Sequence, residues 1–254
     1  MVTAERPRSR YVELPAPAPV AELVACSWMQ HIAGPASYVQ RVLPDGCVDI
    51  IWHHDAGLTV AGPATHADLP QMPGDATTLG VRFHPGGAPA ALGVPAAELR
   101  DGGVDLEALW DADARRLEDR LTDLSDPRLQ LQVLNAAVSR RIAAVAPDEL
   151  VAAAVRHLEQ PGTPVAALAE ALGISGRQLR RRFHDAVGYG PKVLDRVLRL
   201  QRFLAIAEAP GETHPLAVVA AEAGYADQAH LDHDCLRLSG LSPTDLLGTR
   251  RAVA

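Results

Sequence analysis

Cysteine is scarce in this 254-residue sequence, which contains only Cys26, Cys47 and Cys235. The three are widely spaced and form no CxxC pair, so neither a disulfide framework nor a zinc cluster is predicted. No apolar run approaches the roughly 18 residues that cross a bilayer. The first residues carry charges without the apolar segment of a secretory signal. These absences predict a cytoplasmic protein with buried, reduced thiols and no membrane partner.

An excess of positive charge is also missing. The net charge is −7, which by itself argues against a nucleic-acid partner. The charge is unevenly distributed, however. Residues 1–148 contain 12 basic and 19 acidic residues, whereas residues 149–254 contain 12 of each. Within the neutral half, Arg177–Arg202 contains eight basic and two acidic residues. A concentrated basic face matters more for DNA binding than the sum over the chain.

The length predicts two domains, since single domains usually contain about 100–150 residues. We place the boundary near Pro147-Asp148, giving domains at 1–146 and 147–254. In the first, short β-branched and aromatic runs between turn residues predict strands of a small sheet or barrel. The clearest of these runs are Cys47–His54, Leu58–Ala61 and Thr78–Phe83. Helical patterns follow at 105–110, 115–124 and 127–145.

An internal repeat organises the second half. Gly173 and Gly224 are 51 residues apart, and three later pairs of landmarks are each 52 residues apart. These pairs are Leu179/Leu231, Gly188/Gly240 and Pro191/Pro243. Four matched landmarks are not expected from two unrelated helical hairpins.

Each copy has the parts of a helix-turn-helix unit. An Ala-rich helix ends at a glycine, which adopts the left-handed conformation without steric cost. Ser175 or Asp227 then caps a second helix. In the first copy, Leu179 and Phe183 lie on one face of that helix, leaving its arginines on the other. A long helix over Lys192–Ala209 connects the copies.

The motifs "LRRRFHDAVGYGPK" and "AAEAGYADQAHLDHDCLRLSGLSP" resemble the AraC/XylS family of bacterial transcription regulators over about residues 150–248. The resemblance implies that the second helix of each unit enters a major groove of promoter DNA. It implies these DNA-binding residues: Arg177, Gln178, Arg180, Arg181, His184, Arg196, Arg199, Arg202, Gln228, His230, Asp232 and His233. Arginine suits bidentate contact with guanine, so Arg177, Arg180 and Arg181 are the expected base readers.

The second unit departs from the family pattern. His233 stands where the family usually has Arg, and Cys235 where it usually has a core Phe. Residues 212–245 contain six acidic residues and one basic residue. Asp232 and Asp234 are therefore expected near phosphates, where they repel DNA unless a cytosine amino group is offered. The second unit acts either as a selective reader or in a purely structural role.

The N-terminal stretches "RVLPDGCVDIIWHHDAGLTVAGPATHA" and "GVRFHPGGAPAALGVPAAEL" loosely resemble the cupin-like sensor domains of some family members. The resemblance implies an α+β two-domain protein whose β-rich first domain binds a small effector or forms a homodimer. RNA polymerase is a further candidate partner. We predict no catalytic residue, metal or cofactor, leaving two alternatives open: a metal at His53, His66 and His84, and an anion-binding turn at Phe83–Gly87. The rival function is a ligand-binding protein or enzyme with a vestigial DNA-binding domain.

Overall fold

Six antiparallel strands form the main sheet in the computed structural model, which describes residues 8–143, 145, 147–162, 164–210 and 214–251. Their order is β1-β2-β7-β4-β5-β8. The strands are β1 (Arg8–Pro15), β2 (Val24–Ala33), β4 (Val48–His53), β5 (Gly57–Ala61), β7 (Ala76–Phe83) and β8 (Gly103–Asp105). Strands β3 (Tyr38–Val39) and β6 (Gln71–Met72) form a separate pair. A 3₁₀ turn, η1 (Ala18–Val20), joins β1 to β2.

Alternating burial explains why β4 forms where the sequence predicts a strand. Val48, Ile50 and Trp52 are buried, while the residues between them are half-exposed. The register places Ile50 opposite Val60 of β5 and Val81 of β7, so that the apolar side chains lie on one face. Among the described strands, β1 and β8 each have one neighbour. Of the two expected forms, a small sheet or a barrel, the described strands form an open sheet.

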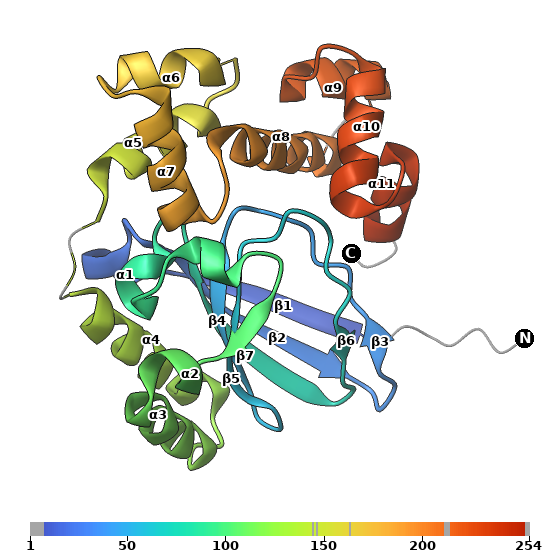
Figure 1. Ribbon diagram of the computed structural model, residues 1–254. Helices are drawn as coiled ribbons and strands as arrows, with labels where there is room; N and C mark the ends of the chain where they lie inside the picture. Colours follow the sequence, from blue (N-terminus) through green and yellow to red (C-terminus); the bar gives the residue numbers. More distant parts are fainter. Residues whose placement is uncertain (1–7, 144, 146, 163, 211–213, 252–254) are drawn as a thin grey trace, which may run out of the picture.

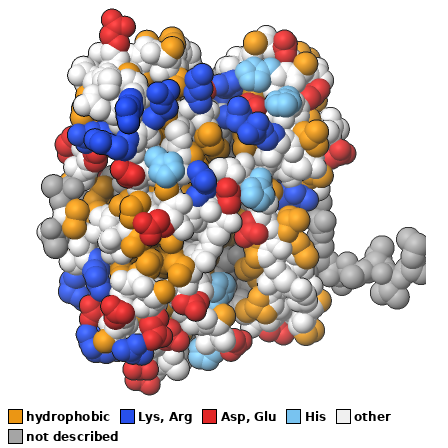
Figure 2. Space-filling model, viewed as in Figure 1, with side chains coloured by type: hydrophobic (Ala, Val, Ile, Leu, Met, Phe, Trp, Pro, Cys, Tyr) orange, Lys and Arg blue, Asp and Glu red, His pale blue; other side chains and the backbone are white. Residues whose placement is uncertain are grey.

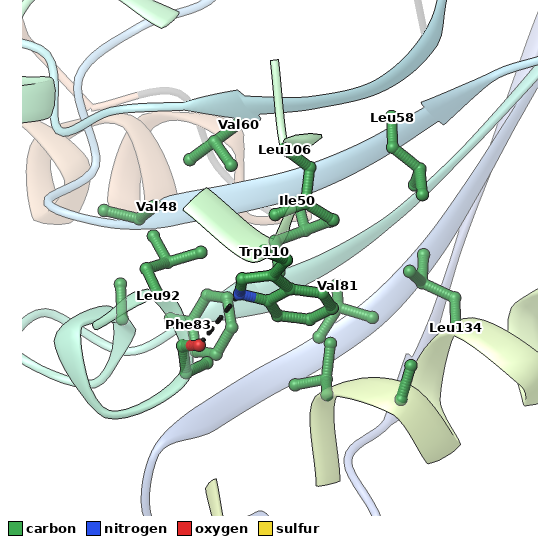
Figure 3. Close-up of a cluster of buried hydrophobic side chains, with 14 of the residues drawn as sticks. Val48, Ile50, Leu58, Val60, Val81, Phe83, Leu92, Leu106, Trp110 and Leu134 are labelled. Carbon is green, nitrogen blue, oxygen red and sulfur yellow. Dashed lines mark hydrogen bonds between the residues drawn. The ribbon is translucent and has the colours of Figure 1, made fainter. Parts of the chain in front are cut away.

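Helices cover this apolar face of the sheet (Figure 1). They are α1 (Ala88–Leu92), the 3₁₀ helix η2 (Ala96–Leu99), α2 (Glu107–Trp110), α3 (Ala112–Thr122) and α4 (Pro127–Ile142). Trp110 lies at the centre of the core, and its Nε1 donates to the carbonyl of Ala91 over 3.0 Å (Figure 3). The bond satisfies the one polar atom of a 3% exposed side chain. It thus fixes α2 against α1.

Seven helices follow among the described residues of the second half. They are α5 (Glu149–Glu159), α6 (Val165–Ala171), α7 (Gly176–Val187), α8 (Pro191–Glu208), α9 (Leu216–Ala223), α10 (Gln228–Ser239) and α11 (Pro243–Arg251). Helices α6 and α7 form the first unit and α9 and α10 the second, at opposite ends of α8 (Figure 1). Each unit has its own hydrophobic core, completed by one end of α8.

The internal repeat is visible in the backbone. Gly188 ends α7 and Gly240 ends α10, both in the left-handed region with φ of 91° and 72°. The α+β two-domain class is therefore confirmed, while the boundary at 146/147 stays a prediction. No described helix has both the length and the hydropathy of a membrane-spanning segment.

Candidate DNA-binding surface

The N-terminus of α7 is fixed by a capping box. The backbone N–H of Gln178 donates to Ser175 Oγ over 3.3 Å, and the N–H of Ser175 donates to Gln178 Oε1 over 2.9 Å. These reciprocal bonds satisfy two amide groups that a helix start leaves unpaired. Gln178 was predicted to bind DNA, but the structure places its side-chain oxygen in this cap.

The buried face of α7 sets the direction of its arginines. Leu179, Phe183 and Val187 pack into the core of the first unit. Arg177, Arg180, Arg181 and His184 are consequently exposed on the opposite side. Within the described residues, the first three form no ion pair. The structure thus brings the expected base readers together on one exposed face.

Arg182 points away from this face and was not predicted to have a role. Its Nη1 donates to Asp148 Oδ2 over 2.6 Å, and Asp148 also accepts from the backbone at the start of α5. Arg182 therefore joins α7 to α5. Lys192, at the start of α8, is an exposed cation that was not predicted to bind DNA.

The three arginines expected on the polar side of α8 are engaged within the protein. Arg196 Nε lies 3.0 Å from Asp234 Oδ1, and Arg199 forms an ion pair with Asp195. Arg202 Nε and Nη1 are buried without a hydrogen-bond partner among the described residues, and burial lowers the pKa of this guanidinium. Arg202 is half-exposed, so its contact with DNA stays a prediction. For Arg196 and Arg199, the expectation of a free polar face omitted their acidic partners.

Helix α10 separates its acidic residues between two faces. Gln228, Asp232 and His233 are exposed, as expected of residues that face DNA. Asp234 is only 2% exposed and turns towards α8, so the expectation that it lies near phosphates is wrong. The reason is helical geometry, because residues two positions apart lie about 200° apart around the axis.

His230 lies at the junction of α10 and α8. Its Nε2 is 3.0 Å from Arg199 Nη1, and its ring meets the ring of Tyr225 edge to face. The Arg199 guanidinium lies 5.3 Å from the centre of the same Tyr225 ring. His230 is therefore held within the protein and is less available to DNA than the sequence pattern indicates.

A band of basic side chains crosses the upper part of the molecule from α7 along α8 towards α10 (Figure 2). Histidines lie at the α10 end of this band. The band runs over the first unit and along α8 to the edge of the second unit on one face, the arrangement expected for binding along a single duplex. Its most accessible charges come from α7.

In the described part of the chain, three hydrogen bonds connect the N-terminal half to the two units and to α8, and none was predicted. Arg41 Nη1 donates to the carbonyl of Ser239 over 2.5 Å, at the end of α10. Gln201 Nε2, on α8, donates to the carbonyl of Pro44 over 2.6 Å. Arg100 Nη1 donates to the carbonyl of Gly188 over 3.4 Å, at the end of α7. Carbonyl acceptors carry no side-chain signal in a sequence.

The structure does not group the histidines considered as metal ligands. His53 contacts Thr78 and His66 lies 3.4 Å from Asp101. Among the described residues, no three His, Cys, Asp or Glu side chains come together as a ligand set. The candidate anion-binding segment Phe83–Gly87 forms a turn closed by a 2.8 Å bond from the Gly87 N–H to the His84 carbonyl.

Residues 168–249 match a family described as a helix-turn-helix domain, and residues 12–105 match a family described as a domain of unknown function. Among solved structures, ToxT from Vibrio cholerae O395 is similar, with 10% identity, 96% of this chain and 98% of that chain covered, and a TM-score of 0.43. An apo ToxT variant from Vibrio cholerae strain SCE256 gives 11% identity, 94% and 96% coverage, and a TM-score of 0.43. The AraC-like transcriptional activator CuxR gives 18% identity, 81% and 82% coverage, and a TM-score of 0.22. No curated protein matched the chain.

Proposed function

We propose that the chain is a DNA-binding regulator of transcription of the AraC type, in which α7 reads bases in the major groove of promoter DNA. Arg177, Arg180 and Arg181 are the base readers in this proposal. Each is exposed, and Arg donors match the O6 and N7 acceptors of guanine. Lys192 and His184 contribute contacts to phosphates.

The observation that carries this proposal is the contrast between α7 and α8. Both helices are rich in arginine, but Arg196 and Arg199 of α8 meet Asp234 and Asp195, and Arg202 has two buried guanidinium nitrogens. The base-reading arginines of α7 have no such partners among the described residues. A guanidinium without an internal partner can bind a base or a phosphate without first breaking an ion pair.

The second unit contributes less to affinity in this proposal. Gln228, Asp232 and His233 are its exposed candidates for base contact. With only a carboxylate, an amide and an imidazole, it reads sequence rather than neutralising phosphates. The two units together then cover two successive major grooves.

The N-terminal domain regulates this binding in our proposal, through a small effector or through a homodimer. Its hydrogen bonds to Gly188, Gln201 and Ser239 support this role, because they reach both units and the helix between them. A change in the sheet domain can therefore alter the relative position of the two units. RNA polymerase is the partner expected of an activator.

The test begins with genome-wide recovery of bound DNA fragments, which supplies a duplex for fluorescence anisotropy. We expect Arg177→Gln/Arg181→Gln to reduce affinity for that duplex at least tenfold. The matched control is Arg128→Gln/Arg156→Gln, which removes two exposed arginines of α4 and α5. Equal affinities for the wild type and both variants would contradict the proposal.

A further inference from the structure

Helices α3 and α4 lie at the end of the molecule opposite the two helix-turn-helix units (Figure 1). Residues of both helices line a hollow. Its volume is about 400 Å³. Four arginines line it, two from each helix: Arg116, Arg120, Arg140 and Arg141. Asp113 is the one carboxylate of the lining, within the part of the chain that the structure describes. Four guanidiniums and one carboxylate leave an excess of three positive charges in the hollow.

The arginines are in two different states. Arg116 Nη2 lies 2.5 Å and Arg141 Nη2 lies 2.9 Å from the two oxygens of Asp113. Arg141 also stacks over the ring of Trp110, 4.8 Å from its centre. Arg120 and Arg140, by contrast, form no ion pair with any described residue. Two positioned guanidiniums therefore stand beside two that have no counter-ion.

The floor of the hollow strengthens its attraction for anions. Trp110, Leu117 and Ala137 line its base and belong to the hydrophobic core. An apolar wall lowers the local dielectric, so that charges above it interact more strongly than on an open surface. Folding brings the two helices together here, although the N-terminal half as a whole is acidic. Basic and acidic side chains both appear over α3 and α4 at the lower left of Figure 2.

We infer that this hollow is a binding site for a small multivalent oxyanion of the phosphate type, separate from the DNA-binding surface. Arg120 and Arg140 supply the direct donors, since guanidinium forks match phosphate oxygens bidentately. Arg116 and Arg141 contribute further donors at the rim, held in place by Asp113. The size of the hollow suits a small phosphorylated molecule better than a macromolecule.

Pyrophosphate is the probe for isothermal titration calorimetry on the full chain in about 150 mM salt. The background carries Arg177→Gln/Arg180→Gln/Arg181→Gln, so that the cations of α7 cannot bind the probe. We expect one saturable site in this background. Adding Arg120→Gln/Arg140→Gln is expected to weaken binding at least tenfold, and adding Arg116→Gln alone to weaken it by a smaller factor. All three arginines are exposed, and circular dichroism verifies that each variant retains the fold.

The matched control adds Arg128→Gln/Arg156→Gln, which removes the same charge outside the hollow. We expect its affinity for pyrophosphate to remain unchanged. Equal weakening by the control, no saturable binding, or displacement by sodium acetate at the same ionic strength would overturn the inference. Each of these results would indicate attraction to diffuse surface charge instead of a site.

Discussion

Asp232 and Asp234 are two residues apart on α10, yet their substitution by Asn is expected to change different properties. The Asp234 variant should lose stability, and the Asp232 variant should bind random DNA more tightly. Asp234 is 2% exposed and lies 3.0 Å from Arg196 Nε. Removing one partner of a fully buried ion pair costs about 3–5 kcal/mol. Because the Arg196 side chain retains 28% exposure, water compensates part of the loss. We therefore expect Asp234→Asn to destabilise the second unit by about 2 kcal/mol.

Hydrogen exchange of the α10 amides measures this loss directly, since all three tryptophans lie in the N-terminal half. A loss of about 2 kcal/mol corresponds to roughly thirtyfold faster exchange of amides that open with the unit. Asp232→Asn is the matched control because Asp232 is exposed. Its exchange is expected to change by no more than about 0.5 kcal/mol in free energy.

For binding to random DNA, we expect Asp232→Asn to have the larger effect of the two substitutions. Unit charges about 8 Å apart in water repel by ~0.5 kcal/mol, so Asp232→Asn should tighten random-DNA binding about twofold per phosphate at that distance. Anisotropy with a random duplex checks this value. If Asp234→Asn tightened random binding equally and left exchange unchanged, Asp234 would face DNA. The inference that Asp234 is buried against α8 would then be refuted.

Three further predictions concern the basic surface and the sheet domain. Arg181→Ala is expected to cost about 1–3 kcal/mol and to relax preference at one base pair; equal losses on specific and random duplexes would assign it to phosphate. The slope of log K against log salt should be roughly −3 to −4 if about four unpaired cations each neutralise one phosphate, and a flat anisotropy titration would refute DNA binding. Burial raises the pKa of Asp49 to about 6, although Arg82 opposes the shift. The carboxyl of Asp49 therefore stays protonated to a higher pH in the folded state than in the unfolded state. Its contribution to stability is greatest below about pH 4 and is lost as pH rises through about 6. Asp49→Asn should remove this part of the pH dependence in urea melts at pH 4 to 7.

Local features of the fold were predictable from the sequence because their partners are close along the chain. The cap of α7 requires Ser175 and Gln178, which are three residues apart. The cap of α10 requires Asp227, which accepts from the His230 N–H over 2.8 Å. The repeat also predicted both helix-turn-helix units, since each landmark glycine ends a helix.

Strand β2 was missed because its burial does not alternate. It lies between β1 and β7, and Cys26, Ser27 and Trp28 are buried in succession. Side chains buried on both faces of a strand remove the period of two on which prediction depends. Helix α8 was predicted correctly over nearly its full length, but the state of its arginines was not.

The charge contrast between the two units is smaller in the folded protein than a count of residues suggests. On the basic side, Arg196 and Arg199 of α8 are paired with carboxylates. On the acidic side, Asp234 is one of those carboxylates, and Asp227 is engaged in capping α10. Ion pairing therefore lowers both charge counts at once, since Arg196 lies in the basic stretch Arg177–Arg202 and Asp234 lies in the acidic stretch 212–245.

After this pairing, the charge contrast that DNA meets lies between the exposed side chains of the two recognition helices. Helix α7 presents Arg177, Arg180 and Arg181, whereas α10 presents Asp232 beside His233. If the second unit acts as a selective reader, the selectivity depends on this single exposed carboxylate, because Asp234 is buried. Repulsion by one charge is small on any one sequence, but it applies to every non-specific site and is offset only where a cytosine amino group donates a hydrogen bond to the carboxylate. The second unit can thus improve specificity while adding little to affinity.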